Sequence, residues 1–108
     1  MNYKLKNLNG DLTSISGTPI MDSMTGKPMT FRYVLIAACE FHRPNIPGEG
    51  IKAYAIGMKL LKAKDEIELN QEELDFLKTL VNNSTVLMSV VIGRINEFLE
   101  GAKESKVE

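Results

Sequence analysis

The chain has 108 residues, of which 44% are hydrophobic and 25% charged, and its formal net charge is −1. This composition excludes an intrinsically disordered chain, and the length excludes two separately cored domains. No apolar stretch approaches the roughly 20 residues that a membrane-spanning helix needs. We therefore predict a single domain over residues 1–108 that does not enter a membrane.

The cysteine content indicates a reducing compartment. Cys39 is the only cysteine, so the chain cannot form an internal disulfide. No charged and apolar leader opens the sequence. We therefore expect the protein in the cytoplasm.

Charge is distributed unevenly along the chain. Residues 1–64 hold nine Lys and Arg against four Asp and Glu, whereas residues 65–108 hold four against ten. Either both halves face solvent, or the basic half meets an anionic ligand or the acidic half of a second subunit. A domain of this size also gains stability from burial between subunits, so we expect a homo-oligomer.

The first 30 residues are rich in Gly, Ser, Thr, Asn and Pro, which indicates strands and turns. Tyr3 and Leu5 alternate with lysines, as in a strand. Further on, two short apolar stretches flank a turn that contains Gly26, with Pro19 and Pro28 at positions typical of a sheet edge. We predict a β-hairpin there.

Thr30 is a suitable N-cap for a first helix over residues 31–41, and a loop with two prolines follows it. A second helix is predicted over residues 51–63. It is amphipathic, with lysines off its apolar face. We expect that face to comprise Ile51, Tyr54, Ala55, Met58 and Leu61.

The third helix has the clearest start signal in the chain. Asn70 is the expected N-cap and Glu73 occupies the capping-box position, which predicts a helix over residues 71–82. A charged connector is expected between the second and third helices. After the third helix, Ser84 or Thr85 can cap a fourth helix that ends at about residue 100. The tail, residues 102–108, is expected to fray.

The fourth helix carries a wide apolar stripe, and burial in the core or in a subunit interface would produce the same pattern. Candidate interface residues are Leu87, Val91, Ile95 and Phe98. The predicted fold is thus α+β and predominantly helical, with an N-terminal β-hairpin packed on about four helices. Residues 1–30 form the β-rich segment and residues 31–101 the helical part.

No pair of reactive groups indicates catalysis. Cys39 and His42 share a helical face, but Cys39 falls on the apolar stripe and His42 lies where its charge suits the helix dipole. One histidine and one cysteine cannot form a zinc site without carboxylates or a second subunit. We expect no enzyme, no metal and no cofactor.

A small anion is the ligand that the sequence favours. Arg43, Lys52 and His42 surround the predicted start of the second helix, whose N–H groups could receive an anion. Nucleic acid is disfavoured, because residues 85–89 at the start of the fourth helix are mostly apolar and no Arg or Lys precedes Arg94 in that helix.

The order of these segments resembles small uncharacterised proteins encoded by bacteriophages and prophages, over roughly residues 15–99. The resemblance implies a phage origin, and hence the cytoplasm of a host cell, and it assigns no catalytic or binding residue. The matching segments are Pro19-Ile20, Asp22, Gly26-Lys27-Pro28-Met29-Thr30, a helix with Leu35 and Ala38, and Glu68-Leu69-Asn70-Gln71-Glu72-Glu73.

These observations lead to three functional hypotheses. The first is a non-enzymatic phage accessory protein that self-associates and binds or sequesters a host protein or a small anionic ligand. The second is a virion structural or assembly protein. The third is a nucleic-acid-binding regulator, whose affinity would fall steeply with salt.

Overall fold

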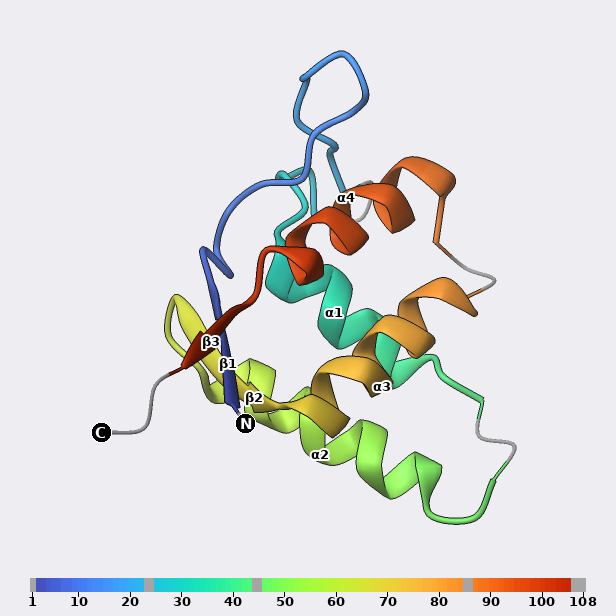
Figure 1. Ribbon diagram of the computed structural model, residues 1–108. Coiled ribbons are helices and arrows are strands. Elements are labelled where there is room, and N and C mark those ends of the chain that lie inside the picture. The colour runs from blue at the N-terminus through green and yellow to red at the C-terminus, as the bar shows by residue number, and fades with distance from the viewer. Residues whose placement is uncertain (1, 23–24, 44–45, 85–86, 106–108) are drawn as a thin grey trace.

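The computed structural model describes residues 2–22, 25–43, 46–84 and 87–105, with side chains up to residue 102. It confirms an α+β, predominantly helical fold (Figure 1). The helices are α1 (Phe31–Glu40), α2 (Glu49–Lys62), α3 (Gln71–Asn82) and α4 (Ser89–Glu100). The strands are β1 (Asn2–Lys6), β2 (Glu66–Asn70) and β3 (Lys103–Ser105). None of the helices in these ranges has the length and apolarity that a membrane crossing requires.

The three strands form an antiparallel sheet in the order β2-β1-β3. Leu5 of β1 lies opposite Ile67 of β2, and both are buried, as is Leu69. The prediction of a connector between α2 and α3 was therefore wrong for β2, because its exposed glutamates alternate with buried apolar residues as a strand requires. The prediction of a frayed tail was also wrong for residues 103–105, which pair with β1, and residues 106–108 lie outside the described residues.

The predicted hairpin in the N-terminal segment is present as short bridges between Met21 and Pro28 and between Asp11 and Thr30. The Asp22 N–H donates to the Lys27 carbonyl at 2.8 Å, which closes the turn. Residues 23–24 of that turn lie outside the described part. The segment is fixed to the helices because Leu12 is buried in the common core.

The capping residues in the sequence predicted the first residues of α1 and α3 correctly. The Thr30 Oγ1 accepts the Tyr33 N–H at 3.1 Å at the start of α1. At α3, the Asn70 Oδ1 accepts the Glu73 N–H at 2.8 Å, and the Glu73 carboxylate accepts the Asn70 N–H at 3.0 Å. Both capping-box bonds are therefore made.

The other two helices begin elsewhere than predicted. Helix α2 starts two residues early, at Glu49, because Gly48 adopts the left-handed conformation (φ 89°) that glycine tolerates and so turns the chain into the helix. Helix α4 starts late, at Ser89, because Met88 keeps an extended backbone with ψ of 154°. The predicted cap Thr85 lies outside the described residues.

Helix α1 lies in the middle of the helical part and contacts α2, α3 and α4. Val91 and Ile95 of α4 are fully buried in the core of this single chain, and Phe98 stacks on Phe31 with ring centroids 4.2 Å apart. Leu87 also packs against this core. Burial in the intramolecular core accounts for Val91 and Ile95, while an interface through the partly buried Leu87 and Phe98 stays a prediction.

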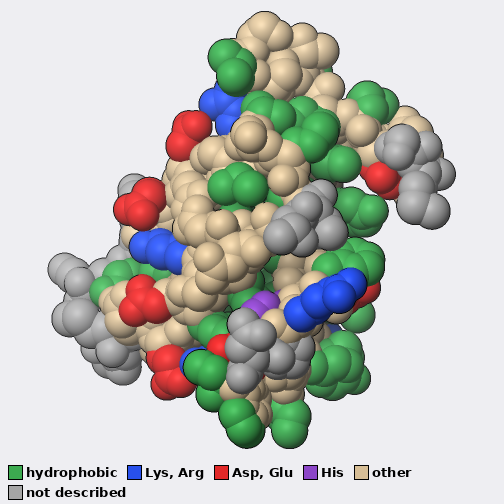
Figure 2. Space-filling model, turned by 90° about the vertical axis from the view of Figure 1, so that its right-hand side faces the viewer, with side chains coloured by type: hydrophobic (Ala, Val, Ile, Leu, Met, Phe, Trp, Pro, Cys, Tyr) green, Lys and Arg blue, Asp and Glu red, His purple; other side chains and the backbone are tan. Residues whose placement is uncertain are grey.

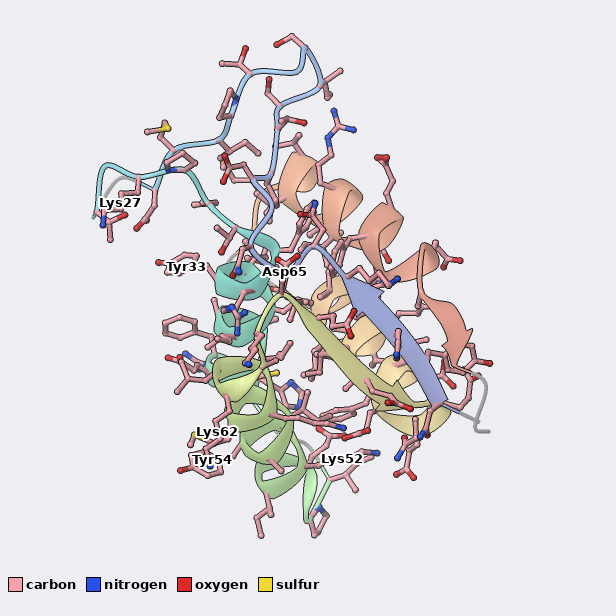
Figure 3. All side chains as sticks on the ribbon, turned by 90° about the vertical axis from the view of Figure 1, so that its left-hand side faces the viewer. Lys27, Tyr33, Lys52, Tyr54, Lys62 and Asp65 are labelled. Atoms are coloured by element: carbon pink, nitrogen blue, oxygen red, sulfur yellow. The ribbon has the colours of Figure 1, made fainter. Side chains whose placement is uncertain are left out.

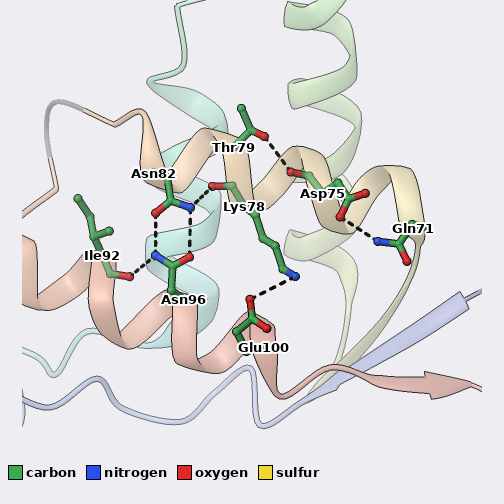
Figure 4. Close-up of polar contacts among 8 residues, drawn as sticks. All are labelled: Gln71, Asp75, Lys78, Thr79, Asn82, Ile92, Asn96 and Glu100. Carbon is green, nitrogen blue, oxygen red and sulfur yellow. Dashed lines mark hydrogen bonds and ion pairs between the residues drawn. The ribbon is translucent and has the colours of Figure 1, made fainter.

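Polar contacts on the outer side join α3 and α4 (Figure 4). The Asn82 and Asn96 side-chain amides exchange two hydrogen bonds, of 3.1 and 2.9 Å. Lys78 and Glu100 approach to 3.5 Å. These contacts link the outer sides of α3 and α4, and both helices also contact α1.

Candidate functional site

Helix α2 is apolar on two faces, and the face that it buries is not the apolar face that the sequence predicted. The buried residues are Ala53, Ile56, Gly57 and Leu60. In contrast, Ile51, Tyr54 and Leu61 are 78%, 69% and 60% exposed. The small residues explain this choice, because a Cβ on Gly57 would lie 3.4 Å from the Cys39 Cβ, so α2 approaches α1 closely along this side.

A cavity of about 490 Å³ lies between α1 and α2. We call it, with the exposed apolar residues of α2 beside it, the α1/α2 groove. Cys39, Ala53 and Gly57 are its buried members, and Tyr54 and Leu61 are exposed. Its volume falls within the range of about 300–1,000 Å³ that is usual for binding pockets. The lining residues are Ile36, Cys39, Glu40, His42, Gly50, Ala53, Tyr54, Gly57, Met58 and Leu61.

Four apolar residues on one side of α2, of which Met58 is half-buried and the others are exposed, are regularly spaced. Ile51, Tyr54, Met58 and Leu61 follow one another at intervals of three, four and three residues. This spacing places them in one row along a helix and is the pattern with which one helix packs against another. Figure 3 shows Tyr54 and Lys62 directed away from the body of the molecule on the outer side of α2.

Further apolar side chains extend this surface. Tyr33 and Phe41, at the two ends of α1, are exposed, and so is Ile46 in the α1–α2 connection. Six of the nine large apolar side chains that are exposed in the described residues thus belong to residues 33–61, so the apolar surface is concentrated here. Figure 2 shows the side of the molecule on which the α1–α2 connection lies, with hydrophobic side chains at that end and also elsewhere on this face.

The residues predicted to hold an anion are joined to acids of the same chain. The His42 Nε2 lies 2.7 Å from the Glu49 carboxylate, and the Lys52 Nζ lies 2.6 Å from the Glu72 carboxylate. The lysine ammonium also lies 4.7 Å from the centroid of the Phe76 ring, which the His42 ring meets edge-on. This cluster attaches the start of α2 to α3.

Arg43 does not join the cluster. It is exposed and makes no hydrogen bond or ion pair with any described residue. Glu49 already places a negative charge in the first turn of α2, where an anion would bind. The His42 ring and the Lys52 ammonium are thus directed at carboxylates rather than at a shared anion.

Electrostatics around the groove do not favour nucleophilic chemistry. Burial, with a smaller effect of the neighbouring Glu40 carboxylate, raises the pKa of the Cys39 thiol from 9.0 to about 12. His42 is hydrogen-bonded to Glu49. A protonated thiol is a poor nucleophile, so the geometry gives Cys39 a packing role.

The ion pair at the start of α2 has its own electrostatic signature. The hydrogen bond from Lys52 and, to a smaller extent, the positive charge of Lys52 lower the pKa of the Glu72 carboxyl.

In the described ranges, no three His, Cys, Asp or Glu side chains are grouped as a metal ion would require.

Comparison of the chain with models of protein families, with curated proteins and with solved structures gives no match.

Sequence reasoning found part of the groove without placing it. The sequence predicts Ile51, Tyr54 and Leu61 on one apolar face of this helix and does not indicate that the face is exposed. The signal that indicates exposure of this face is the row of small residues, Ala53 and Gly57, on the adjacent face of the same helix. Tyr33, Phe41 and Ile46 were missed, because exposure of an apolar residue depends on contacts from other segments.

Proposed function

We propose that this chain is a non-enzymatic accessory protein, of bacteriophage type by its resemblance, that binds a protein partner in the α1/α2 groove. One observation carries the proposal: the row of Ile51, Tyr54, Met58 and Leu61 lies beside an open cavity instead of in the core. Exposing such a row costs solubility and brings no packing energy within the chain. A partner that covers it would gain about 25 cal/mol for each Å² of apolar surface removed from water.

The groove supports a protein partner better than a small anion. Its buried members, Cys39, Ala53 and Gly57, offer apolar surface, while His42 and Lys52 are already paired. A small apolar ligand in the cavity is the second candidate, favoured by the cavity volume alone. The expected homo-oligomer stays a prediction, and it loses the support of Val91 and Ile95, which lie in the core.

Native mass spectrometry of the protein purified from the cells that naturally make it tests the proposal, since it reports bound proteins and small molecules together. Wild-type protein is expected to retain a second protein in a defined ratio. The double variant Tyr54→Glu/Leu61→Glu is expected to lose it. The control Ile15→Glu, at an 88% exposed position in the N-terminal segment, is expected to retain it.

Each outcome has a distinct meaning. A protein that all three forms retain equally would refute binding in the groove. A small mass that wild type and the control retain, and the double variant loses, would assign the groove to a small ligand. Circular dichroism spectra of the three forms must agree, so that loss of binding is not loss of fold.

A further inference from the structure

We propose that the occupant of the α1/α2 groove is one amphipathic α-helix of a different protein, with an apolar face and acidic residues beside that face. The inference rests on the proposed function and names the chemistry of the partner. Three features carry it: the spacing of the exposed row, the charges beside it, and the surface that a second copy of this chain would offer.

The spacing of the row favours a helical partner. From Ile51 to Leu61 the row spans ten residue steps, or about 15 Å at 1.5 Å per step, which is nearly three helical turns. Side chains at intervals of three and four residues form ridges that fit the grooves of a second helix. An extended peptide would instead seek backbone hydrogen bonds, and the groove is formed by helices whose backbone groups are bonded internally.

The cavity provides a place for the partner's largest side chain. Gly57 and Ala53 leave an open floor, and Met58 beside them has a flexible side chain that adapts to an inserted group. An apolar side chain on the docked helix would enter here, in the way that a knob enters a hole. Tyr54 and Leu61 would then cover it from the exposed side.

The charges beside the groove favour an acidic partner. The segment from residue 31 to residue 64 holds six Lys and Arg against two Glu. Within the described residues, Lys62 and Arg43 form no ion pair, and Lys62 directly follows the groove residue Leu61. Glu40 is the only acid among the lining residues and would accept one basic group of the partner. Carboxylates beside the apolar face of the partner would complement this surface.

A second copy of the chain fits the groove poorly. Contact between two identical grooves would bring together two segments that each keep a net charge of +2 after the ion pairs of Lys52 and Lys59 with Glu72 and Glu73 are counted. Alternatively, the groove of one copy could contact the acidic half of the other. Among the described residues from 65 onward, Met88 is the only exposed large apolar side chain, so that half offers little apolar surface to the groove. Neither arrangement combines apolar and charge complementarity.

Selection from a displayed library of random 20-residue peptides tests the inference without knowledge of the natural partner. Wild-type protein serves as the bait, and peptides that also bind Tyr54→Glu/Leu61→Glu are removed. We expect the enriched sequences to carry apolar residues at intervals of three and four, with Asp and Glu at the neighbouring positions. A synthetic copy of an enriched peptide should become helical on binding.

Affinities of that synthetic peptide, measured by fluorescence anisotropy, complete the test. We expect Ile51→Glu to weaken binding at least about tenfold, and the double variant at least about 30-fold. Ile15→Glu, the same substitution at a similarly exposed isoleucine outside the groove, should change it less than twofold. Lys62→Glu should weaken binding about two- to fivefold at low salt and less at high salt.

The opposite results are equally specific. Enriched peptides that are basic or rich in proline, yet depend on the groove, would overturn the acidic helix and leave the proposed function intact. A dimer of the wild type that dissociates in the double variant would assign the groove to a second copy. Enrichment that never depends on the groove would overturn the inference, while the mass spectrometry would still decide the proposed function.

Discussion

The orientation of α2 decides whether the α1/α2 groove exists, and two neighbouring leucines test it. Leu60 is 0% exposed and lies in the core, whereas Leu61 is 60% exposed. The substitutions Leu60→Ala and Leu61→Ala remove the same three carbons from the same helix. They also change helix propensity equally, so any difference between them reports burial.

The structure sets the two magnitudes. Leu60→Ala loses about 2–3 kcal/mol of transfer free energy, at about 0.8 kcal/mol per methylene, and leaves a cavity, so the total cost is about 3–5 kcal/mol. Leu61→Ala removes a side chain that is mostly in water, so the cost is at most about 1 kcal/mol. For a domain of this size, 1 kcal/mol lowers Tm by about 4 °C. We therefore expect Leu60→Ala to lower Tm by about 12–20 °C and Leu61→Ala to lower it by at most about 4 °C.

Chemical denaturation followed by circular dichroism measures both values, and thermal unfolding gives the Tm shifts. Equal slopes with denaturant concentration are required, because a changed slope would mean a changed unfolded state. If Leu61→Ala costs as much as Leu60→Ala, then α2 presents the predicted face to the core. The groove would then be absent, and the proposed function would fail with it.

Three further predictions concern the fold around the groove. Asn70→Ala removes the acceptor of the Glu73 N–H and should cost about 1 kcal/mol, whereas Asn70→Ser should keep most of it; equal Tm values for all three forms would refute the capping role. Arg32 donates to the carbonyl oxygens of Leu60, Ala63 and Lys64 at the end of α2, so Arg32→Met should cost at least about 2 kcal/mol and speed amide exchange in the last turn of α2; unchanged exchange would contradict it. Because the pKa of Cys39 rises from 9.0 to about 12 on folding, its contribution to stability is complete below pH 9 and is lost as pH rises towards 12, by about 1.4 kcal/mol per pH unit. Denaturation at about pH 8 and pH 10 should show this loss in wild type and not in Cys39→Ala, and parallel losses in both would refute it.

Local signals predicted much of the helical part. Thr30 and Asn70 cap α1 and α3 as expected, because a capping side chain bonds to backbone groups two or three residues away and needs no other part of the chain. The four helices and the hairpin around Gly26 follow from patterns of the same short range.

Strands beyond β1 were not predictable in this way. Residues 66–70 and 103–105 become strands because β1 supplies hydrogen-bond partners on both of its edges, and β1 is about 60 and 100 residues away in sequence. The alternation of glutamates with Ile67 and Leu69 in residues 66–70 fits a strand as well as a charged connector, and pairing with β1 decides between them, whereas residues 103–105 carry no alternation. The apolar stripe of α4 is a second example, because burial in a core and burial in an interface produce the same sequence pattern.

The sequence by itself determined that the fold is mostly helical and that α2 carries an apolar row of Ile51, Tyr54, Met58 and Leu61. Only the tertiary structure decided where that row points. Helix α2 has two apolar faces, and the one with Ala53 and Gly57 allows the closer approach to α1, so more atoms come into contact there. The larger side chains are left outside, and this choice between two faces creates the groove.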